Sequence, residues 1–393
     1  MDKASVRRNI ILYKIYVLFN EPLFWGPILI TSIQKLGHMS LPDIYFLESA
    51  TMILCVLLDI PSGALADLIG KKKVLIIGRI FLLLSMFGFA LTIGPKTAWL
   101  ANILWAIGYS FQSGADVSLF YNSLKSRGLE HIYKKTEGKA FGSRLLLTGL
   151  CALVVGPLAT INLRIPLLLC IPFVMISVVA VFYFEEPAQT KKYSVRKQIA
   201  LLKEGVHFVL NKREVRWIVL FGALMTGASK IWFFTYNPYF ERVHLDMKYY
   251  GFVFFLLNII AWLSSHYAYR VERCMSESRS IVIMILCIGI PVIVMGLVPI
   301  TPCVYLVLFQ NIVRGFIRPF NSDYMNRHII ADDIRTTINS VQSTTADSIS
   351  IVTLSLFGLL VARIHVLNSL VVLGIVVLCL GCFSYRSYKR LDR

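Results

Sequence analysis

The sequence predicts an all-α polytopic membrane protein with twelve transmembrane helices in two six-helix bundles. Of the 393 residues, 56% are hydrophobic and only 16% are charged, and the mean hydropathy is +0.68. A soluble core cannot hold so large a share of apolar side chains. The apolar residues also fall into stretches that are long enough to cross a bilayer, which takes about 20 residues per helix. One long polar stretch divides these spans into two sets.

The twelve predicted spans follow the chain in order. They cover residues 10–33, 43–68, 73–93, 97–125, 136–160, 164–184, 215–240, 248–270, 278–298, 302–329, 334–361 and 366–386. The polar stretch gives three predicted parts, namely an N-terminal bundle at 1–186, a cytoplasmic linker at 187–214 and a C-terminal bundle at 215–393. The chain start lacks a small-residue cleavage site after its first apolar run, so we expect this run to remain as the first span.

The linker contains a predicted amphipathic helix. Ile199, Leu202 and Val206 recur at helical spacing, with Lys203 and His207 on the other side. Such a helix is expected to lie at the cytoplasmic membrane surface. It could be a regulatory strap between the bundles, or a basic tether that holds them together and contacts anionic membrane lipid.

The net charge of +18 is a topology signal. Lys and Arg are concentrated in alternate loops and at both ends of the chain, and the opposite loops carry one or two each. Short basic loops stay on the cytoplasmic side. We therefore expect both termini to be cytoplasmic in a cell inner membrane. The basic residues do not form one patch, so no nucleic acid partner is expected.

The loop after the second span reads GALADLIGKKK, at residues 63–73. It resembles the cytoplasmic loop between helices 2 and 3 of the major facilitator superfamily. Weaker matches are SGADVSLFYNSLKSRG in the fourth span, GLCALVVGPLA in the fifth, and the connection between the tenth and eleventh spans, which includes Arg335. Together these motifs resemble the bacterial drug-efflux-like, proton-antiporter branch over the full length. The resemblance implies the major facilitator fold and alternating access between two bundles.

The resemblance also implies roles for five loop residues, Gly63, Asp67, Gly70, Lys71 and Arg335. Asp67 is expected to face the N-terminus of helix 11 near Arg335 in one state. Glycines 63 and 70 are expected to allow a close helix approach and a tight turn. Family members pair the residue at position 71 with an acid at the end of helix 4. This chain has Asn122 there, so the pairing should be weaker or run through Glu130.

Ionisable residues inside spans are the candidates for function, because an unpaired charge in a bilayer is costly. Three acids are proton-coupling candidates: Glu21, Asp59 and Asp116. Pro22 follows Glu21 and should interrupt backbone hydrogen bonding there, admitting water. Asp59 shares a helix face with the loop motif, so gating is an alternative role. Asp116 lies in the fourth span, and Arg144 is its expected partner, with a silent ion pair as the alternative.

Arg144 is also a candidate for substrate binding or gating, and the other candidates for this role lie in the second half of the chain. They are Lys230, Tyr236, Arg314, Arg318 and Asp347. Arg314 and Arg318 are one helical turn apart and point the same way. Asp347 is expected to neutralise one of them, leaving the other for a carboxylate or phosphate on the substrate. The alternative is that Asp347 and water satisfy both.

The expected function is secondary active transport, as proton-coupled efflux of a small organic compound. Catalytic motifs, phosphate loops and metal-ligand clusters are not found in the sequence, so we expect neither an enzyme nor a cofactor or metal. One alternative is a carrier for an anionic metabolite, siderophore or lipid-like substrate. A transporter-derived receptor or sensor without flux is the alternative from another class. The expected partners are the small-molecule substrate, protons and membrane lipid, with the protein as a monomer.

Overall fold

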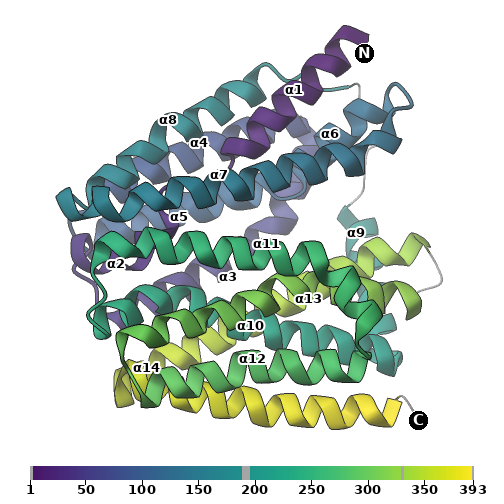
Figure 1. Cartoon of the computed structure of the whole chain (residues 1–393). Helices are drawn as coiled ribbons and strands as arrows, with labels where there is room; N and C mark the ends of the chain where they lie inside the picture. Colours follow the sequence, from purple (N-terminus) through teal and green to yellow (C-terminus); the bar gives the residue numbers. More distant parts are fainter. Residues whose placement is uncertain (1–2, 188–194, 329–331, 392–393) are drawn as a thin grey trace. The chain divides into compact units, whose positions relative to one another are not determined.

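A computed structural model describes residues 3–187, 195–328 and 332–391, and within them it contains only α-helices and short 3₁₀ helices (Figure 1). The first half contains α1 (Lys3–Phe19), η1 (Gly26–Ile28), α2 (Leu29–Leu36), α3 (Leu41–Ile69), α4 (Lys71–Ala90), α5 (Pro95–Gln112), α6 (Ala115–Lys125), η2 (Glu130–Ile132), α7 (Tyr133–Ile161) and α8 (Arg164–Phe182). The predicted all-α class is confirmed.

The second half begins with α9, which covers most of the predicted linker. Its elements are α9 (Val195–Asn211), α10 (Arg213–Arg242), η3 (Met247–Tyr249), α11 (Tyr250–Cys274), α12 (Glu277–Leu297), η4 (Thr301–Leu306), α13 (Val307–His328) and α14 (Asp332–Leu391). Helix α14 is two helices in sequence, because His365 has a non-helical backbone with φ 63° and ψ 164°. Counted this way, the elements outside α9 correspond to the twelve predicted spans.

Eight of the described helices are long and apolar enough to cross a membrane by length and composition. One of the eight is the stretch Val341–Leu391, which contains two of the predicted spans. The first, fourth and tenth predicted spans do not meet this criterion. The first is broken after Phe19, the fourth is broken at Gly114, and the tenth carries Arg314 and Arg318. All three of these spans carry ionisable side chains, and two of them also contain a break.

The chain divides into two compact units. Unit 1 contains residues 1–39, 50–194 and 247–255, and unit 2 contains residues 40–49, 195–246 and 256–393. Helices α3 and α11 each contribute one end to each unit. The predicted division at 1–186, 187–214 and 215–393 stays a prediction.

Each unit uses a pair of facing glycines to bring two helices close together. In unit 1, a Cβ on Gly78 of α4 would lie 3.0 Å from the carbonyl oxygen of Gly108 on α5. In unit 2, a Cβ on Gly374 of α14 would lie 2.8 Å from the carbonyl oxygen of Gly289 on α12. Small residues allow such close backbone packing between membrane helices. Each unit thus has one helix pair whose backbones pack closely.

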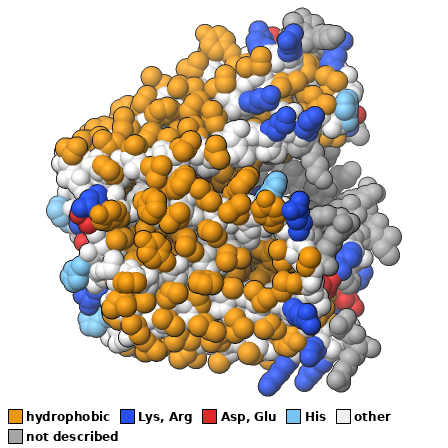
Figure 2. All heavy atoms as spheres, in the orientation of Figure 1, with side chains coloured by type: hydrophobic (Ala, Val, Ile, Leu, Met, Phe, Trp, Pro, Cys, Tyr) orange, Lys and Arg blue, Asp and Glu red, His pale blue; other side chains and the backbone are white. Residues whose placement is uncertain are grey.

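The surface of each unit is divided between hydrophobic and charged side chains. Hydrophobic side chains cover most of the visible face along the length of the helices, and Lys and Arg gather mainly near helix ends (Figure 2). This arrangement suits helices that cross a bilayer, because the apolar band contacts lipid and the charges remain in water.

Candidate functional site

A break in the first span places Glu21 in a non-helical segment. Helix α1 ends at Phe19, and the next helical residue is Gly26. Pro22 causes this break, because proline has no amide hydrogen and disfavours a helical backbone at the residue before it. The predicted interruption at Glu21 is confirmed. It leaves the last carbonyls of α1 without helical partners.

Arg79 on α4 supplies the missing donors. Its guanidinium donates to the carbonyl oxygens of Asn20 (2.7 Å) and Phe19 (3.4 Å), to Gln112 Oε1 (2.8 Å) and to Ser177 Oγ. The side chain is fully buried, with 0% of its surface exposed. All four acceptors are uncharged. Arg79 therefore joins the end of α1 to α5 and α8 and brings a positive charge beside the break.

A second break, in the fourth span, places Asp116 at the start of a helix. Gly114 has φ 74°, a conformation that favours glycine, and α6 begins at the next residue. Asp116 Oδ1 accepts the backbone N–H of Val117 (2.7 Å), and Oδ2 accepts the hydroxyl of Tyr16 (2.9 Å). A carboxylate is stabilised at a helix N-terminus by the helix dipole. Both of these hydrogen-bond donors to Asp116 are neutral.

Helix α7 presents Glu137, Phe141 and Arg144 on one face, at positions i, i+4 and i+7. Arg144 Nη1 donates to Glu21 Oε1 (2.7 Å) and to the side-chain oxygen of Asn20 (2.9 Å), and its guanidinium lies 4.7 Å from the centre of the Phe141 ring. The face is therefore turned toward the break in the first span.

The partner that we expected for Arg144 is wrong. The sequence predicts Asp116, but the structure pairs Arg144 with Glu21. The reason is that Asp116 is already bonded to Tyr16 and to the first turn of α6. The carboxylate of Glu137, in turn, accepts the hydroxyl of Tyr13.

These side chains line a polar cavity of about 210 Å³ inside unit 1. Its walls come from α1, the break after it, α5, α6 and α7. The lining residues are Tyr13, Val17, Asn20, Glu21, Tyr109, Gln112, Ser113, Asp116, Glu137, Phe141 and Arg144. Carboxylates, amides and aromatic rings together can hold a polar organic molecule, and the carboxylates can exchange protons with cavity water.

In unit 2, Asp347 pairs with Lys230. The Nζ–Oδ1 distance is 2.6 Å, between α14 and α10. This corrects the expectation that Asp347 neutralises Arg314 or Arg318, both of which are exposed side chains on α13. The lysine is the partner because its helix packs directly against α14.

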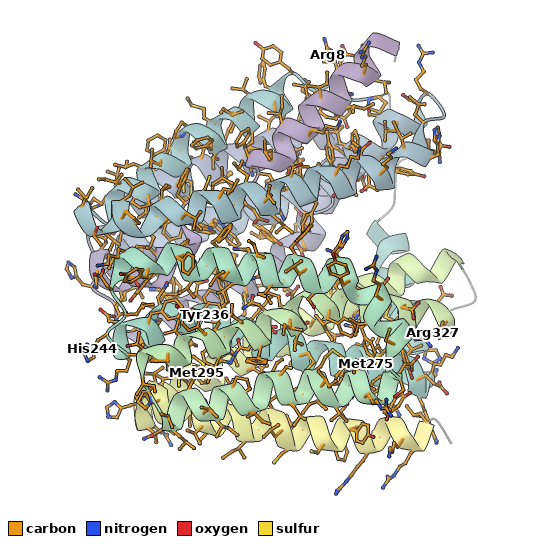
Figure 3. All side chains as sticks on the ribbon, viewed as in Figure 1. Arg8, Tyr236, His244, Met275, Met295 and Arg327 are labelled. Carbon is orange, nitrogen blue, oxygen red and sulfur yellow. The ribbon has the colours of Figure 1, made fainter. Side chains whose placement is uncertain are left out.

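Tyr236 belongs to a buried polar network within unit 2. Asn311 Nδ2 donates to the Tyr236 hydroxyl (3.0 Å), and Arg314 donates to Asn311 Oδ1 (3.4 Å). Tyr236 lies between the two ends of this unit, with His244 at one end and Arg327 at the other (Figure 3). Among the described residues, the buried Nε1 of Trp232 and Nε2 of Gln310 have no hydrogen-bond partner. The Tyr236 hydroxyl donates to Gln310 Oε1 (3.4 Å), so Gln310 Nε2 is a donor of this network that is available for water or a ligand.

The loop motif is built around Gly70 and Glu186. Gly70 has φ 103°, which confirms the predicted tight turn. The Glu186 carboxylate accepts the backbone N–H groups of Lys71 (2.7 Å) and Lys72 (3.2 Å) at the start of α4. The carboxylate that contacts this loop is therefore Glu186, from the segment after α8. From the sequence we expected an acid at the end of helix 4, or Glu130, beside Lys71.

Two other features of the motif differ from the expectation or are not described. A Cβ on Gly63 would meet nothing within 4 Å in the structure, so the close approach that we expected there is absent among the described residues. Arg335 lies in α14, but its side chain is outside the described residues. The role of Asp67 beside helix 11 stays a prediction.

Asp59 lies apart from the polar cavity. It is exposed on α3, a helix that contributes no residue to the cavity lining. Sequence reasoning missed Tyr13, Gln112 and Glu137 as lining residues. The spacing of Glu137 from Arg144 could have identified it, because both fall on one helical face.

A comparison with models of protein families identifies the family to which this chain belongs. The family model of the Major Facilitator Superfamily matches residues 17–353. The chain belongs to this superfamily. It is a multi-pass membrane transporter for a small-molecule substrate and not an enzyme, and its fold supports secondary transport.

Solved structures share the fold at low sequence identity. The nucleoside transporter NupG is 14% identical with a TM-score of 0.78, over 98% of this chain and 99% of that chain. A bacterial homolog to the human lysosomal transporter Spinster is 11% identical with a TM-score of 0.73, covering 99% and 98%. A D-xylose–proton symporter is 12% identical with a TM-score of 0.70, covering 97% of each chain. None of the curated proteins matches this sequence.

Proposed function

We propose that this protein is a proton-coupled transporter that exports a small polar organic compound and binds it in the cavity of unit 1. The observation that carries the proposal is the composition of that cavity. Glu21, Asp116 and Glu137 are brought together from separate elements, and Arg144 pairs with only one of them.

The charges of this cluster favour proton coupling. Three carboxylates face the two guanidiniums of Arg144 and Arg79, so one negative charge is in excess when all five groups are ionised. An uncompensated charge inside a membrane is costly. Protonation of Asp116 or Glu137 neutralises this excess negative charge. Glu21 is paired with a guanidinium, whereas the side-chain donors to Asp116 and Glu137 are neutral tyrosine hydroxyls. These two therefore take the proton while the Glu21–Arg144 pair is closed, and Glu21 can take one only when that pair opens.

The same charge explains how transport and proton movement are coupled. A substrate that carries a positive charge or several hydroxyl groups can also satisfy the ionised carboxylates. Proton and substrate then compete for one site, and alternating access converts this competition into exchange. Glu21 and Asp116 remain the proton-coupling candidates, joined by Glu137. Asp59 is retained for gating, because it lies away from the cavity.

The topology of the proposal follows from charge. Basic residues at both ends of the chain favour cytoplasmic termini in an inner membrane. The fold relatives include a D-xylose–proton symporter and a nucleoside transporter, which makes pentoses and nucleosides reasonable probes alongside organic cations.

A thermal-shift screen of the purified protein tests the class of ligand. The panel contains organic cations, nucleosides, pentoses and organic acids, each at one pH below and one above neutrality. Cationic or hydroxylated compounds should raise Tm more at the higher pH, because the carboxylates are then ionised. In Asp116→Asn this pH dependence should shrink.

Stabilisation by organic acids alone would contradict the proposal. If Arg314→Ala and Arg318→Ala then abolish that stabilisation, the protein is a carrier of anions. A compound that binds but never crosses the membrane of a proteoliposome would instead indicate a receptor.

A further inference from the structure

A second cavity in unit 2 lies away from the residues discussed so far. Its volume is about 570 Å³, and it is formed by the first turns of α10 and by both halves of α14. It takes no residue from the polar cavity of unit 1. We call it the α10–α14 groove. Trp217 Nε1 donates to the carbonyl oxygen of Ser384 (2.9 Å), which holds the two helices together beside it.

The groove has one cationic end and one apolar end. Arg213 and Arg216 lie in the first turn of α10, and Arg390 lies in the last turn of α14. The walls further along are apolar, with Leu224 on α10 and Leu380 on α14. At a rise of about 1.5 Å per residue, the apolar part extends roughly 15 Å from the arginines, which is about the depth of one bilayer leaflet.

The groove opens to the outside of the unit. Leu220 is 51% exposed and Phe383 is 74% exposed, and both line it. Exposed apolar side chains in a membrane-spanning helix contact lipid. The C-terminal end of α14 is at the side of unit 2 that carries Arg327 and Met275 (Figure 1 and Figure 3). The groove therefore runs from a charged helix end into the lipid-facing surface.

The positive charges of the three arginines are not neutralised by acidic side chains of the described residues. Arg216 Nη1 donates to the carbonyl oxygen of Leu210 (3.0 Å). Within the part of the chain that the structure describes, none of the three forms a salt bridge. Three guanidiniums beside one groove repel one another unless an anion joins them. An amphiphile with an anionic head and an apolar tail meets both chemical requirements.

We propose that the α10–α14 groove binds one anionic phospholipid of the bilayer, with the phosphate at Arg213, Arg216 and Arg390 and an acyl chain along Leu220 and Leu224. Basic helix ends face the cytoplasmic leaflet, which is the leaflet that carries anionic lipid. A free phosphate would leave the apolar walls uncovered. The cationic headgroup of a zwitterionic lipid would face three like charges.

The proposed lipid would also affect how helix α9, in the linker, packs. Helix α9 packs against both α10 and α14, the two helices that form the groove. A lipid that joins the start of α10 to the end of α14 would stabilise the surface on which α9 rests. This inference is independent of the substrate and of proton coupling.

Native mass spectrometry of the full-length protein in detergent tests the proposal. The probes are phosphatidylglycerol, phosphatidylcholine and inorganic phosphate. Phosphatidylglycerol should be retained in preference to phosphatidylcholine. Arg213→Gln and Arg390→Gln should each weaken its binding about fivefold, since one cationic side chain near the surface contributes about 1 kcal/mol.

Two further variants make the result specific. Arg279→Gln is the matched control, because Arg279 is an exposed arginine in the first turn of α12 and does not line the groove. Leu220→Trp should reduce lipid binding by filling the apolar wall while it leaves the arginines in place. The Tm of each variant without added lipid shows whether it is folded.

Two outcomes would overturn the proposal. The first is equal retention of phosphatidylglycerol and phosphatidylcholine, or an equal loss in Arg279→Gln, which would indicate a general attraction to basic residues. The second is inorganic phosphate binding that survives Leu220→Trp, together with phosphatidylglycerol retention that is unchanged in Arg213→Gln and Arg390→Gln. That result would show that the arginines bind a free anion and that the lipid binds elsewhere.

Discussion

Arg79 shows how one side chain can hold a broken helix in place. A helix end inside a bilayer leaves carbonyl groups that water cannot reach, and each unsatisfied buried group costs about 1–3 kcal/mol. Arg79 offsets this cost, because its guanidinium donates hydrogen bonds to the carbonyl oxygens of Phe19 and Asn20 and to the side chain of Gln112. The break that exposes Glu21 therefore depends on a residue that need not touch the substrate.

We predict that Arg79→Met destabilises the protein by about 3 kcal/mol or more, because it leaves several buried acceptors without a donor. Arg79→Lys should recover part of the loss, since lysine keeps the charge but lacks the planar fork. The measurement is unfolding in mixed detergent, followed by circular dichroism. Lys96→Gln, at an exposed position, is the control. Equal stability of Arg79→Met and the control would show that the buried guanidinium does not brace the break.

At the scale of elements, the turn between α3 and α4 depends on backbone conformation and on one carboxylate. Gly70 has a positive φ, and the Glu186 carboxylate caps the N-terminus of α4 directly beside it. A side chain at this position would meet Glu186 at 2.8 Å. The glycine is therefore required for its conformation, and a methyl group in its place would also force the Glu186 carboxylate to shift.

We predict that Gly70→Ala destabilises the protein by about 1–3 kcal/mol, the usual cost of a sparsely populated backbone conformation. Gly63→Ala is a matched control from the same motif, because a methyl group there meets nothing within 4 Å. It should be neutral or slightly stabilising, since alanine is the better helix former. Midpoints of thermal unfolding measure both. The account of this turn is wrong if the two substitutions have the same effect.

The sequence predicts helices, breaks and turns better than it predicts which side chains form ion pairs. The break at Glu21 is predictable because Pro22 imposes it locally, and the turn at Gly70 because glycine and a basic run follow a span. The partner of Arg144 is not predictable, because it depends on which face α7 turns toward the end of α1. The same holds for Lys230 and Asp347, which are separated by 117 positions and meet only when α10 packs against α14.

At the scale of the whole molecule, the two units divide the chemistry. Unit 1 contains the polar cavity, in which acids outnumber bases, and unit 2 contains a paired lysine, exposed arginines and the α10–α14 groove. Two of the three spans that fail a simple test of apolarity, the first and the fourth, carry most of the cavity residues, whereas α7, which carries Glu137 and Arg144, passes the test. In a membrane transporter this is expected, because a helix that lines an aqueous cavity cannot be apolar on every side.

Transport by purified protein in proteoliposomes tests the central claim, that the acids of unit 1 couple substrate movement to protons. The labelled compound is the strongest stabiliser from the thermal-shift screen. An imposed pH gradient should drive its accumulation against its own gradient in the wild type. Asp116→Asn should abolish this accumulation and retain exchange of labelled for unlabelled compound. Accumulation that ignores the pH gradient, or coupling that persists in both Asp116→Asn and Glu21→Gln, would contradict the account.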